Sequence, residues 1–536
     1  MKNNRAEELT CPRKNISSRD STLIIDLADK RLPGTVDKTM CVVGTGIGGG
    51  SFIARYLKYK GDMVVIEAGS KRENVDVTDE SVGRNFDLAM TREISLGGTS
   101  NSWRSLCSPL DRIDFVSRRW MNMSGWPIDP NDLNPHYAEA ARLLDLPEFS
   151  RFASARMEPE TMTLAHAFDF DRNTLENKFF LQTRPPRNFR DALLQRFQRS
   201  DDLLLMNAVA VEIVTNREGN VAEIILVKAP GGESVEIRAK HFVLTAGALE
   251  TPRLLLNSRR WNGKGVGNDH DLAGRFLMDH PMGSLSQLRL DRIRKAPLYH
   301  SVKIGPKHYM KAGFVLTEEM QEKYRLPNHC FYLWPSFHRG IDERFEKLRR
   351  NLITARKRWL KPGDILALVS GPNTLYRIMA YLFPLEACYL YADLFFVTEQ
   401  VPNRNSTVSL SEKKDRFGYP IARIDWKLTR EDIDSIAVFN ELALNALATG
   451  GTRIFFRKTK DRIGDTLTSA AHHLGTARMG ADARSGVVDR DLKVWGVDNL
   501  HICDASVFPT SGNANPALTI SALAIRLADR LAEIPS

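Results

Sequence analysis

The sequence has no long, uninterrupted run of apolar residues. Its most apolar stretch, residues 376–397, is interrupted by Pro384 and carries Arg377, Glu386 and Asp393. A charge at the centre of a bilayer costs about 2.5–3.5 kcal/mol on insertion scales. We therefore expect buried helices in this stretch and no membrane span.

Cysteine is scarce, with six residues in a chain of 536, and none of them has C-x-x-C spacing. This pattern indicates neither a disulfide framework nor a metal site. The first twenty residues are polar and lack the apolar core of a secretory signal. We expect residues 1–20 to form a disordered tail and the protein to be cytoplasmic.

Neither sign of charge dominates, because 75 Lys and Arg stand against 65 Asp and Glu for a net charge of +10. The basic residues are scattered, and the densest cluster, residues 344–361, has the pattern of an amphipathic helix with a solvated basic face. The charge pattern therefore predicts no nucleic-acid partner and gives little support to a membrane-surface contact. The length predicts more than one domain.

A glycine-rich turn stands between two short apolar runs near the start of the chain. The run 40–43 leads into the turn, a helical segment follows at 51–59, and the second run, 63–66, ends at an acid. This order predicts a βαβ unit whose helix N-terminus receives a pyrophosphate and whose acid binds ribose hydroxyls. The acid disfavours NADP, while the motif leaves NAD and FAD open. The predicted dinucleotide site consists of Gly44, Gly46, Gly48, Gly49 and Glu67.

Five further blocks resemble the glucose-methanol-choline (GMC) oxidoreductase family. They are residues 97–100, 247–258, 274–281, 472–476 and 496–516. The resemblance runs from about residue 21 to the end of the chain and is weakest between 283 and 466. It implies an α/β fold, in which a Rossmann-type FAD-binding domain is interleaved with an α+β substrate domain built on an antiparallel sheet.

The resemblance also implies a division of the chain. The discontinuous FAD-binding domain comprises residues 21–105, 200–282 and 467–536, and the substrate domain and cap comprise 106–199 and 283–466. Beyond the glycine turn and Glu67, the implied cofactor contacts are Gly98, Thr99, Ser100, Asn101, Ser102, Ala246, Asp504, Ala505, Asn515 and Pro516.

Within the family, residues 97–103 and 125–128 look most like the sugar-oxidising branch. In that branch pyranose oxidase attaches its flavin through a histidine just before a tryptophan. Here Ser102 precedes Trp103, and a hydroxyl cannot form the histidyl bond. We therefore predict that FAD is held without a covalent bond.

Oxidation of an alcohol requires a hydride acceptor, a base for the hydroxyl proton and a donor that holds the oxygen. The resemblance implies flavin N5 as acceptor, His472 of the H-x-x-G-T pattern as base and Asn515 as the residue that holds the substrate oxygen. We expect the imidazole of His472 to titrate near neutral pH. Asn515 could also cap the helix that follows, and we expect structural roles for His280 and His473.

The sequence thus predicts an FAD-dependent oxidoreductase that converts an alcohol group of a sugar or sugar-like molecule to a carbonyl. The electron acceptor is O2 or another compound. A flavin-containing lyase of the same fold and a non-catalytic flavin-binding partner protein are the alternatives. The hydroxyl that is oxidised and the oligomeric state are left open.

Overall fold

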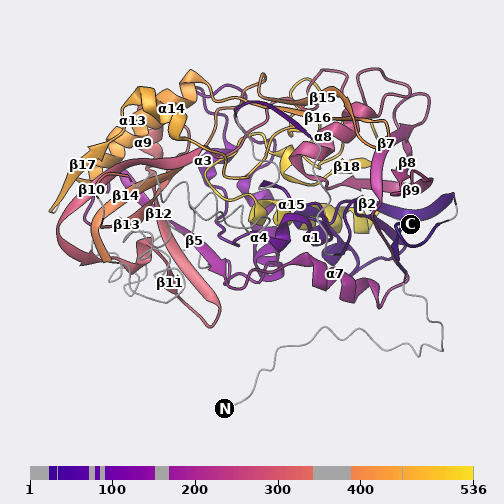
Figure 1. The fold of residues 1–536 in the computed structure, drawn as a ribbon, viewed down its shortest axis with the longest axis horizontal. Helices are drawn as coiled ribbons and strands as arrows, with labels where there is room; N and C mark the ends of the chain where they lie inside the picture. The colour runs from indigo at the N-terminus through magenta and orange to yellow at the C-terminus, as the bar shows by residue number, and fades with distance from the viewer. Residues whose placement is uncertain are drawn as a thin grey trace, which may run out of the picture.

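The computed structural model describes residues 23–534, apart from 33, 72–78, 85–90, 151–167, 338, 342–387 and 449–450. The expected tail at 1–20 and the expected basic helix at 344–361 lie outside the described residues. Two large sheets stand at opposite ends of the molecule (Figure 1).

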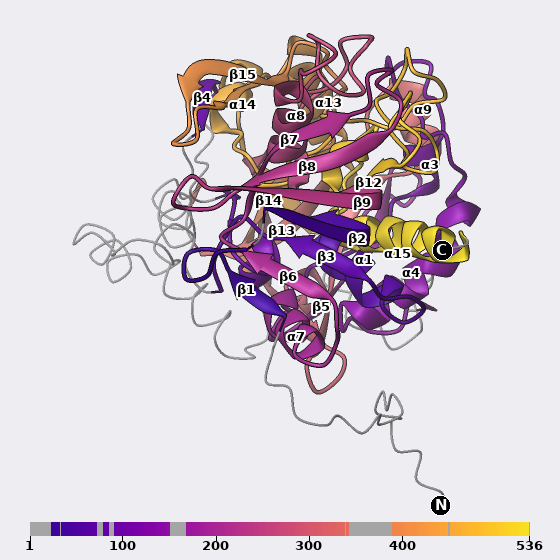
Figure 2. The ribbon, with the colours of Figure 1, turned by 90° about the vertical axis from the view of Figure 1, so that its right-hand side faces the viewer.

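The first sheet carries the predicted βαβ unit. Its spatial order is β1-β6-β3-β2-β9-β8-β7, with β18 beside β9, and all pairs are parallel except β9–β8 and β8–β7 (Figure 2). The predicted strand 63–66 is confirmed, and residues 209–215 and 222–228 pair as an antiparallel hairpin. The strands are β1 (Ile24–Asp26), β2 (Thr35–Val43), β3 (Met63–Ile66), β6 (Leu203–Met206), β7 (Val209–Thr215), β8 (Ala222–Lys228), β9 (Ser234–Leu244) and β18 (Leu500–Ile502).

Helices cover this sheet because β3 (MVVI) and β6 (LLLM) are apolar and buried along their whole length. Helix α1 (Ile47–Tyr56) packs on α15 (Ala517–Glu533), which packs on α4 (Pro130–Leu143). Figure 2 shows these three helices together beside the sheet. Helices α7 (Phe189–Phe197) and α8 (Gly247–Asn257) complete this half of the molecule.

The second sheet is antiparallel, in the order β11-β12-β13-β14-β10-β17, with β5 also paired to β12. Helix α13 (Arg430–Leu447) packs Ile436 and Phe439 into its core. The combination of a largely parallel and an antiparallel sheet confirms the expected fold class. The strands are β5 (Leu175–Thr183), β10 (Met282–Lys295), β11 (Val302–Lys303), β12 (His308–Leu316), β13 (Cys330–Ser336), β14 (Cys388–Val397) and β17 (Thr452–Arg457).

The expectation of buried helices over 376–397 is wrong for its described part, because residues 388–397 form strand β14. The run YLYADLFFV is rich in aromatic residues, which favour strands. It is buried on both faces, so the polar alternation that marks a half-exposed strand is missing. Within the described chain, no helix combines the length and apolar character needed to cross a bilayer.

A third, three-stranded sheet joins β15 (Thr407–Lys414), β16 (Pro420–Trp426) and β4 (Glu80–Gly83) and packs against α8. The expected domain boundaries stay a prediction. Packing crosses them, because α4 and α7, expected in the substrate part, contact α15 and α1. The remaining short elements are η1 (Gly98–Asn101), α3 (Arg112–Phe115), η2 (Pro297–Tyr299), α9 (Glu318–Tyr324), α14 (Lys460–Thr466) and η3 (Ala505–Val507).

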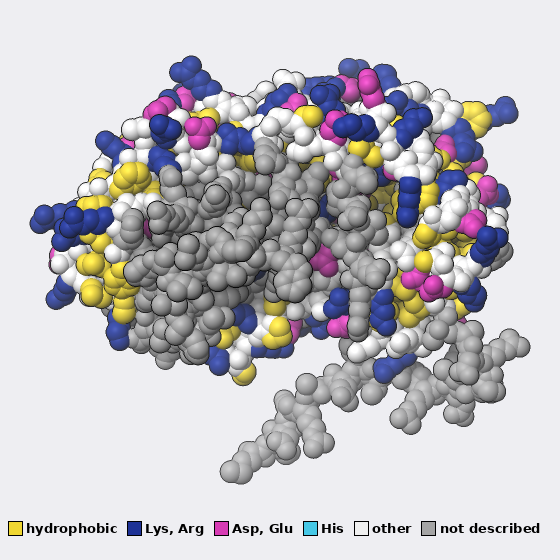
Figure 3. Space-filling model, viewed as in Figure 1, with side chains coloured by type: hydrophobic (Ala, Val, Ile, Leu, Met, Phe, Trp, Pro, Cys, Tyr) yellow, Lys and Arg dark blue, Asp and Glu magenta, His cyan; other side chains and the backbone are white. Residues whose placement is uncertain are grey.

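The surface shows no single basic patch on the face drawn in Figure 3, where Lys and Arg are spread over both ends and interspersed with Asp and Glu. All five cysteines in the described chain are free.

Candidate active site

Four strand ends meet at one edge of the parallel sheet. Val43 at the end of β2 pairs with Ile66 of β3 and with Leu244 of β9, which in turn pairs with Ile502 of β18. Parallel strands end at the same edge, which is where ligands bind in open α/β sheets. The glycine turn, Glu67 and the segment that begins at Cys503 therefore lie together.

The predicted glycines serve different purposes in this turn. A Cβ on Gly48 would lie 2.2 Å from the carbonyl oxygen of Cys503, and one on Gly49 would lie 2.2 Å from that of Gly44. A Cβ on Gly98 would lie 3.0 Å from Cα of Gly46, so the second glycine loop is packed on the first. Gly46 differs from the others, because a Cβ there would meet nothing within 4 Å.

Glu67 is buried and bonded to protein groups. Its carboxylate accepts from the backbone N–H of Thr45 (3.2 Å), from the Thr45 hydroxyl and from the N–H of Gly69 (2.9 Å). The Thr45 hydroxyl also accepts from the N–H of Gly97 (2.9 Å), so it joins both glycine loops to the acid. Burial raises the pKa of Glu67 to about 7, against the opposing effect of these hydrogen bonds.

The polar side chains of the second glycine loop also bond within the protein. Ser100 donates to the carbonyl of Gly97 (2.6 Å) and accepts a backbone N–H (3.0 Å). Asn101 donates its amide to a loop carbonyl (2.9 Å), while its buried Oδ1 has no partner within the described structure. Thr99 is exposed and Ser102 is half-buried.

Asp504 connects the C-terminal segment to the start of α8. Its carboxylate accepts from the N–H of Gly247 (2.9 Å), just after the half-buried Ala246 at the N-cap. Burial raises the pKa of Asp504, and hydrogen bonds oppose that rise. The next carbonyl, that of Ala505, accepts from the N–H of Gly475 (3.2 Å), so this segment also holds the turn that follows His472.

The turn that carries His472 wraps around a fully buried carboxylate, Asp279. Asp279 accepts three backbone N–H groups, from His280 (2.6 Å), Ala470 (3.0 Å) and His472 (3.2 Å), together with the hydroxyl of Ser469 (2.7 Å). Burial raises the pKa of Asp279 to about 6, although each of these bonds acts to lower it. The two adjacent residues Asp279 and His280 thus hold the position of His472.

His472 and His280 touch through their rings. Their Nδ1 atoms are 2.8 Å apart and the ring planes meet at 84°, while Nε2 of His280 lies 3.1 Å from the carbonyl oxygen of Ser511. Burial lowers the pKa of His280 to about 4. Desolvation, with the neighbouring imidazoles of His280 and His473, lowers the pKa of His472 well below its ordinary value. At neutral pH the ring of His472 is therefore in its neutral form, with one N–H and one lone pair, instead of titrating there as expected.

Asn515 lies four residues after Ser511 and is half-buried. Its side chain makes no hydrogen bond to the described part of the chain. The N-cap of α15 is Pro516, and no side chain bonds to that helix end. The helix-capping role considered for Asn515 is therefore absent, and its amide is available to a ligand.

A buried ion pair supports the loop that leads to Asn515. Arg118 and Glu399, both with fully buried side chains, form two hydrogen bonds of 2.6 Å. Glu399 also accepts from the N–H of Gly512 (3.3 Å), and the ammonium of Lys178 donates to Asn513 (2.7 Å). Burial acts to raise the pKa of Glu399, but the Arg118 guanidinium and further hydrogen bonds hold it below its ordinary value.

Comparison with known proteins agrees with this geometry. Residues 402–524 match the GMC oxidoreductase family. The resemblance of the sequence blocks to the GMC oxidoreductases is thereby confirmed. It is 23% identical to the 6'''-hydroxyparomomycin C oxidase of Streptomyces lividus over 93% of this chain and 92% of the relative. It is 27% identical to the 2-methyl-1,2-propanediol dehydrogenase of Mycolicibacterium austroafricanum over 60% of this chain and 52% of that protein.

The fold agrees with that of pyridoxine 4-oxidase from Mesorbium loti, with a TM-score of 0.58 and 18% identity over 93% of this chain and all of that one. Together with the family match and the named relatives, these findings show that the protein is an oxidoreductase with FAD as its cofactor.

The carboxyl edge of the first sheet fits that cofactor. Helix α1 begins at Gly46 with no side-chain cap and no acid in its first turn, so its first N–H groups have no side-chain partner there. The open space at Gly46 lets an anion approach these donors closely. The diphosphate of FAD matches this arrangement in charge and in the space that it needs.

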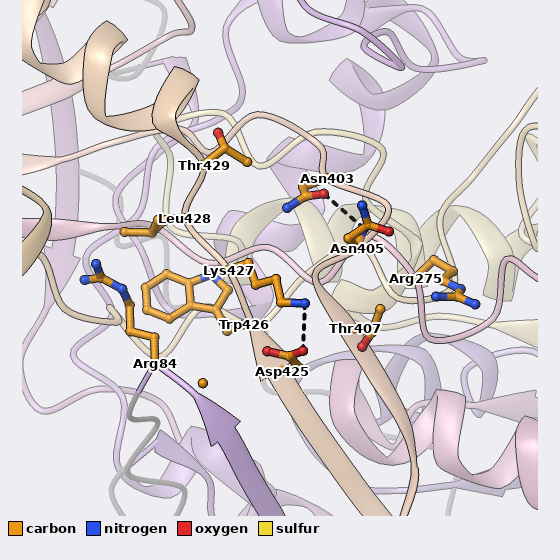
Figure 4. A pocket seen from close by; sticks show the side chains of 11 residues that line it. Arg84, Arg275, Asn403, Asn405, Thr407, Asp425, Trp426, Lys427, Leu428 and Thr429 are labelled. Atoms are coloured by element: carbon orange, nitrogen blue, oxygen red, sulfur yellow. Dashed lines mark hydrogen bonds and ion pairs between the residues drawn. The ribbon is translucent and has the colours of Figure 1, made fainter.

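A separate cavity of about 750 Å³ lies between the end of β4 and the end of β16 (Figure 4). Among its basic residues, Lys427 pairs with Asp425 at 2.9 Å. Its wall includes Trp426, which donates to Oε1 of Gln400 (2.9 Å), and the same oxygen accepts the N–H of Asp279 (3.1 Å). None of the predicted site residues lines this cavity.

Sequence reasoning missed several residues that shape the site. Thr45 occupies a variable position of the glycine motif, which predicts no role for it. Asp279 and His280 lie in the family-like block 274–281, for which we expected only a structural role of His280. Their adjacency in Met-Asp-His-Pro was the available signal. Glu399 and Ser511 gave no local signal, because their importance depends on partners distant in the chain.

Proposed function

We propose that this GMC oxidoreductase oxidises an alcohol group of a sugar-like substrate to a carbonyl, with His472 as base and Asn515 holding the substrate oxygen. The observation that carries this proposal is the contact of His472 with His280, which is bonded to the loop that leads to Asn515. The name of the Streptomyces relative, an oxidase of an aminoglycoside, supports a sugar or aminocyclitol as substrate class.

FAD, when bound, supplies the hydride acceptor. The glycine turn and the N-terminus of α1 would hold its diphosphate, and Glu67, just after the end of β3, would bind the ribose. The loop 98–102, Ala246, Asp504, Ala505 and Pro516 would contribute further contacts. Ser102 before Trp103 supports a cofactor held without a covalent bond.

His472 is suited to remove the hydroxyl proton because its lowered pKa leaves the imidazole neutral, with one ring nitrogen free to accept a proton. The half-buried amide of Asn515, with no protein partner, can donate to the oxygen as negative charge develops on it. Asp279 keeps the His472 turn in place through three backbone hydrogen bonds, so the base needs little reorganisation.

The proposal leaves two kinds of electron acceptor, because one of the two named relatives is an oxidase and the other is a dehydrogenase. The acceptor is O2 or another compound, and a cytoplasmic location remains a prediction from the cysteine pattern.

The test is anaerobic mixing of the purified holoenzyme with sugars, glycosides, aminocyclitols and simple alcohols, while the yellow absorption of the flavin is recorded. We expect bleaching, fastest with a sugar or an aminocyclitol. Cleavage of a substrate without bleaching would favour the lyase alternative. Bleaching by simple alcohols alone would overturn the substrate class, and the absence of any reaction would favour a binding protein.

A further inference from the structure

His280 is fully buried between two partners, the ring of His472 and the backbone carbonyl of Ser511. It is not placed to meet a substrate directly, since both ring nitrogens are engaged. Its position nevertheless determines which nitrogen of His472 can act as a base.

The proton positions follow from the partners. A backbone carbonyl oxygen can only accept a hydrogen bond, so Nε2 of His280, 3.1 Å from the oxygen of Ser511, must carry a hydrogen. Burial keeps this imidazole neutral at neutral pH, and a neutral imidazole has one N–H and one lone pair. Nδ1 of His280 therefore holds a lone pair and accepts.

The same reasoning extends to His472. Its Nδ1 lies 2.8 Å from Nδ1 of His280, and two lone pairs would repel each other at this distance, so Nδ1 of His472 carries the hydrogen. We propose that His280 is a positioning residue that fixes His472 in the tautomer with a hydrogen on Nδ1 and a free lone pair on Nε2, the atom that accepts the substrate proton.

The charges around His280 are paired. Asp279 accepts the N–H of His280 and the turn of His472, and the imidazole of His473 lies 4.0 Å from this carboxylate. On the Ser511 side, Glu399 pairs with Arg118. Beyond it, Lys178 pairs with Asp111. Among the described residues, no carboxylate lies within hydrogen-bond distance of the His280 ring. Burial lowers the pKa of His280 more than the distant carboxylate of Glu399 raises it.

This inference rests on the proposed function, because it matters only if His472 is the base. It goes beyond that function by assigning a proton to a particular atom in the resting enzyme. It also separates His280 from an ordinary buried histidine, whose loss would affect folding without changing the protonation of its neighbour.

The direct test is nuclear magnetic resonance of the holoenzyme with ¹⁵N- and ¹³C-labelled histidine. The His472 signals are assigned from their loss in His472→Gln. We expect the ring of His472 to show a protonated Nδ1 and an unprotonated Nε2. A protonated Nε2 and an unprotonated Nδ1 would overturn the proposal, whatever the activity of the enzyme.

The second test compares two substitutions at His280. In His280→Asn, Oδ1 replaces the lost acceptor, whereas His280→Leu removes it. We expect His280→Leu to slow substrate-driven flavin bleaching by about 10- to 100-fold, the usual cost of losing an orienting partner, and His280→Asn to recover most of that rate. Equal rates in the two variants would contradict the proposal, as would an unchanged rate in His280→Leu.

The matched control is His329→Leu, which removes another buried imidazole, bonded to Ser435 at 3.1 Å, without contact to His472. We expect its bleaching rate to match that of the parent. If His280→Leu does not fold, the resonance measurement on the parent enzyme decides alone. If the His472→Gln variant used for assignment bleaches at the parental rate, the proposed function fails. If that variant bleaches slowly but the parent shows the other tautomer of His472, only the role of His280 is rejected.

Discussion

The nucleotide edge and the reacting turn of this enzyme are built in opposite ways. At the nucleotide edge, backbone groups face the proposed cofactor position, and the side chains of Thr45, Glu67 and Ser100 are bonded to the protein. At the reacting turn, the imidazole of His472 is the proposed base, and buried side chains hold it in place.

The difference teaches what each site tolerates. A binding site formed by backbone groups depends on the absence of side chains, so cofactor binding there should be most sensitive to an added methyl group. A side-chain base depends on which nitrogen carries the proton, so its activity should be most sensitive to the loss of a hydrogen-bond partner. The following predictions test this contrast, from the largest expected effect to the smallest.

His472→Ala should slow substrate-driven flavin bleaching by about 100- to 10,000-fold, because a positioned base contributes that factor. The FAD content should match that of the parent, since no contact of His472 reaches the glycine turn. Stopped-flow absorbance and the flavin-to-protein ratio measure the two quantities. An unchanged bleaching rate would remove His472 from the reaction.

Arg118→Met should lower the free energy of unfolding by about 3–5 kcal/mol, because it leaves the buried Glu399 without its partner. Urea denaturation measures the loss. The control is Arg430→Met, which breaks an exposed pair with Asp434 at 3.7 Å and should cost at most about 1 kcal/mol. Similar losses in both variants would show that the buried pair does not support the reacting half.

Gly48→Ala and Gly46→Ala should separate folding from cofactor binding. The first forces a methyl group against the carbonyl of Cys503 and should cost about 1–3 kcal/mol of stability. The second has open space and should leave stability unchanged, but weaken FAD by about tenfold or more, equivalent to about 1.4 kcal/mol. Gly263→Ala, on the exposed surface, is the control for both. Tight FAD binding by Gly46→Ala would place the diphosphate elsewhere.

Glu67→Gln should change how stability depends on pH. Burial raises the pKa of Glu67 from 4.5 to about 7, so the stability that this group contributes is present below pH 4.5 and is lost as the pH rises through 7. Glutamine cannot ionise, so the variant should gain on the parent by up to about 1.4 kcal/mol per pH unit in this window. Urea denaturation at pH 5, 6 and 7 measures the gain.

The control for this change is Glu80→Gln. Hydrogen bonds from Ser411 and Lys413 lower the pKa of the half-buried Glu80, so its replacement should make the variant less stable than the parent at pH 5 to 7. A gain of the same sign in both variants would rule out burial as the cause at Glu67.

Local pattern was sufficient for the nucleotide half of the fold. The apolar run 63–66 could form only a buried strand between polar flanks, and the glycine turn required close backbone approach, as the contacts of Gly48 and Gly49 show. Residues 388–397 offered only their apolar composition and no alternation of polar and apolar side chains. The prediction of helix there was wrong, because the segment is a strand buried on both faces.

By itself, the sequence determined the βαβ unit, because that unit depends on neighbours in the chain. It also gave the helix N-terminus as a candidate diphosphate site and His472 and Asn515 as candidate reacting residues, from the glycine turn and from family-like blocks. Only the tertiary structure decided that His280 contacts His472, that Ser511 accepts from His280, and that Asp279 holds the turn. The physical reason is that a proton's position depends on the acceptor it meets in space, and residues 279–280, 469–472 and 511 meet only in the folded chain.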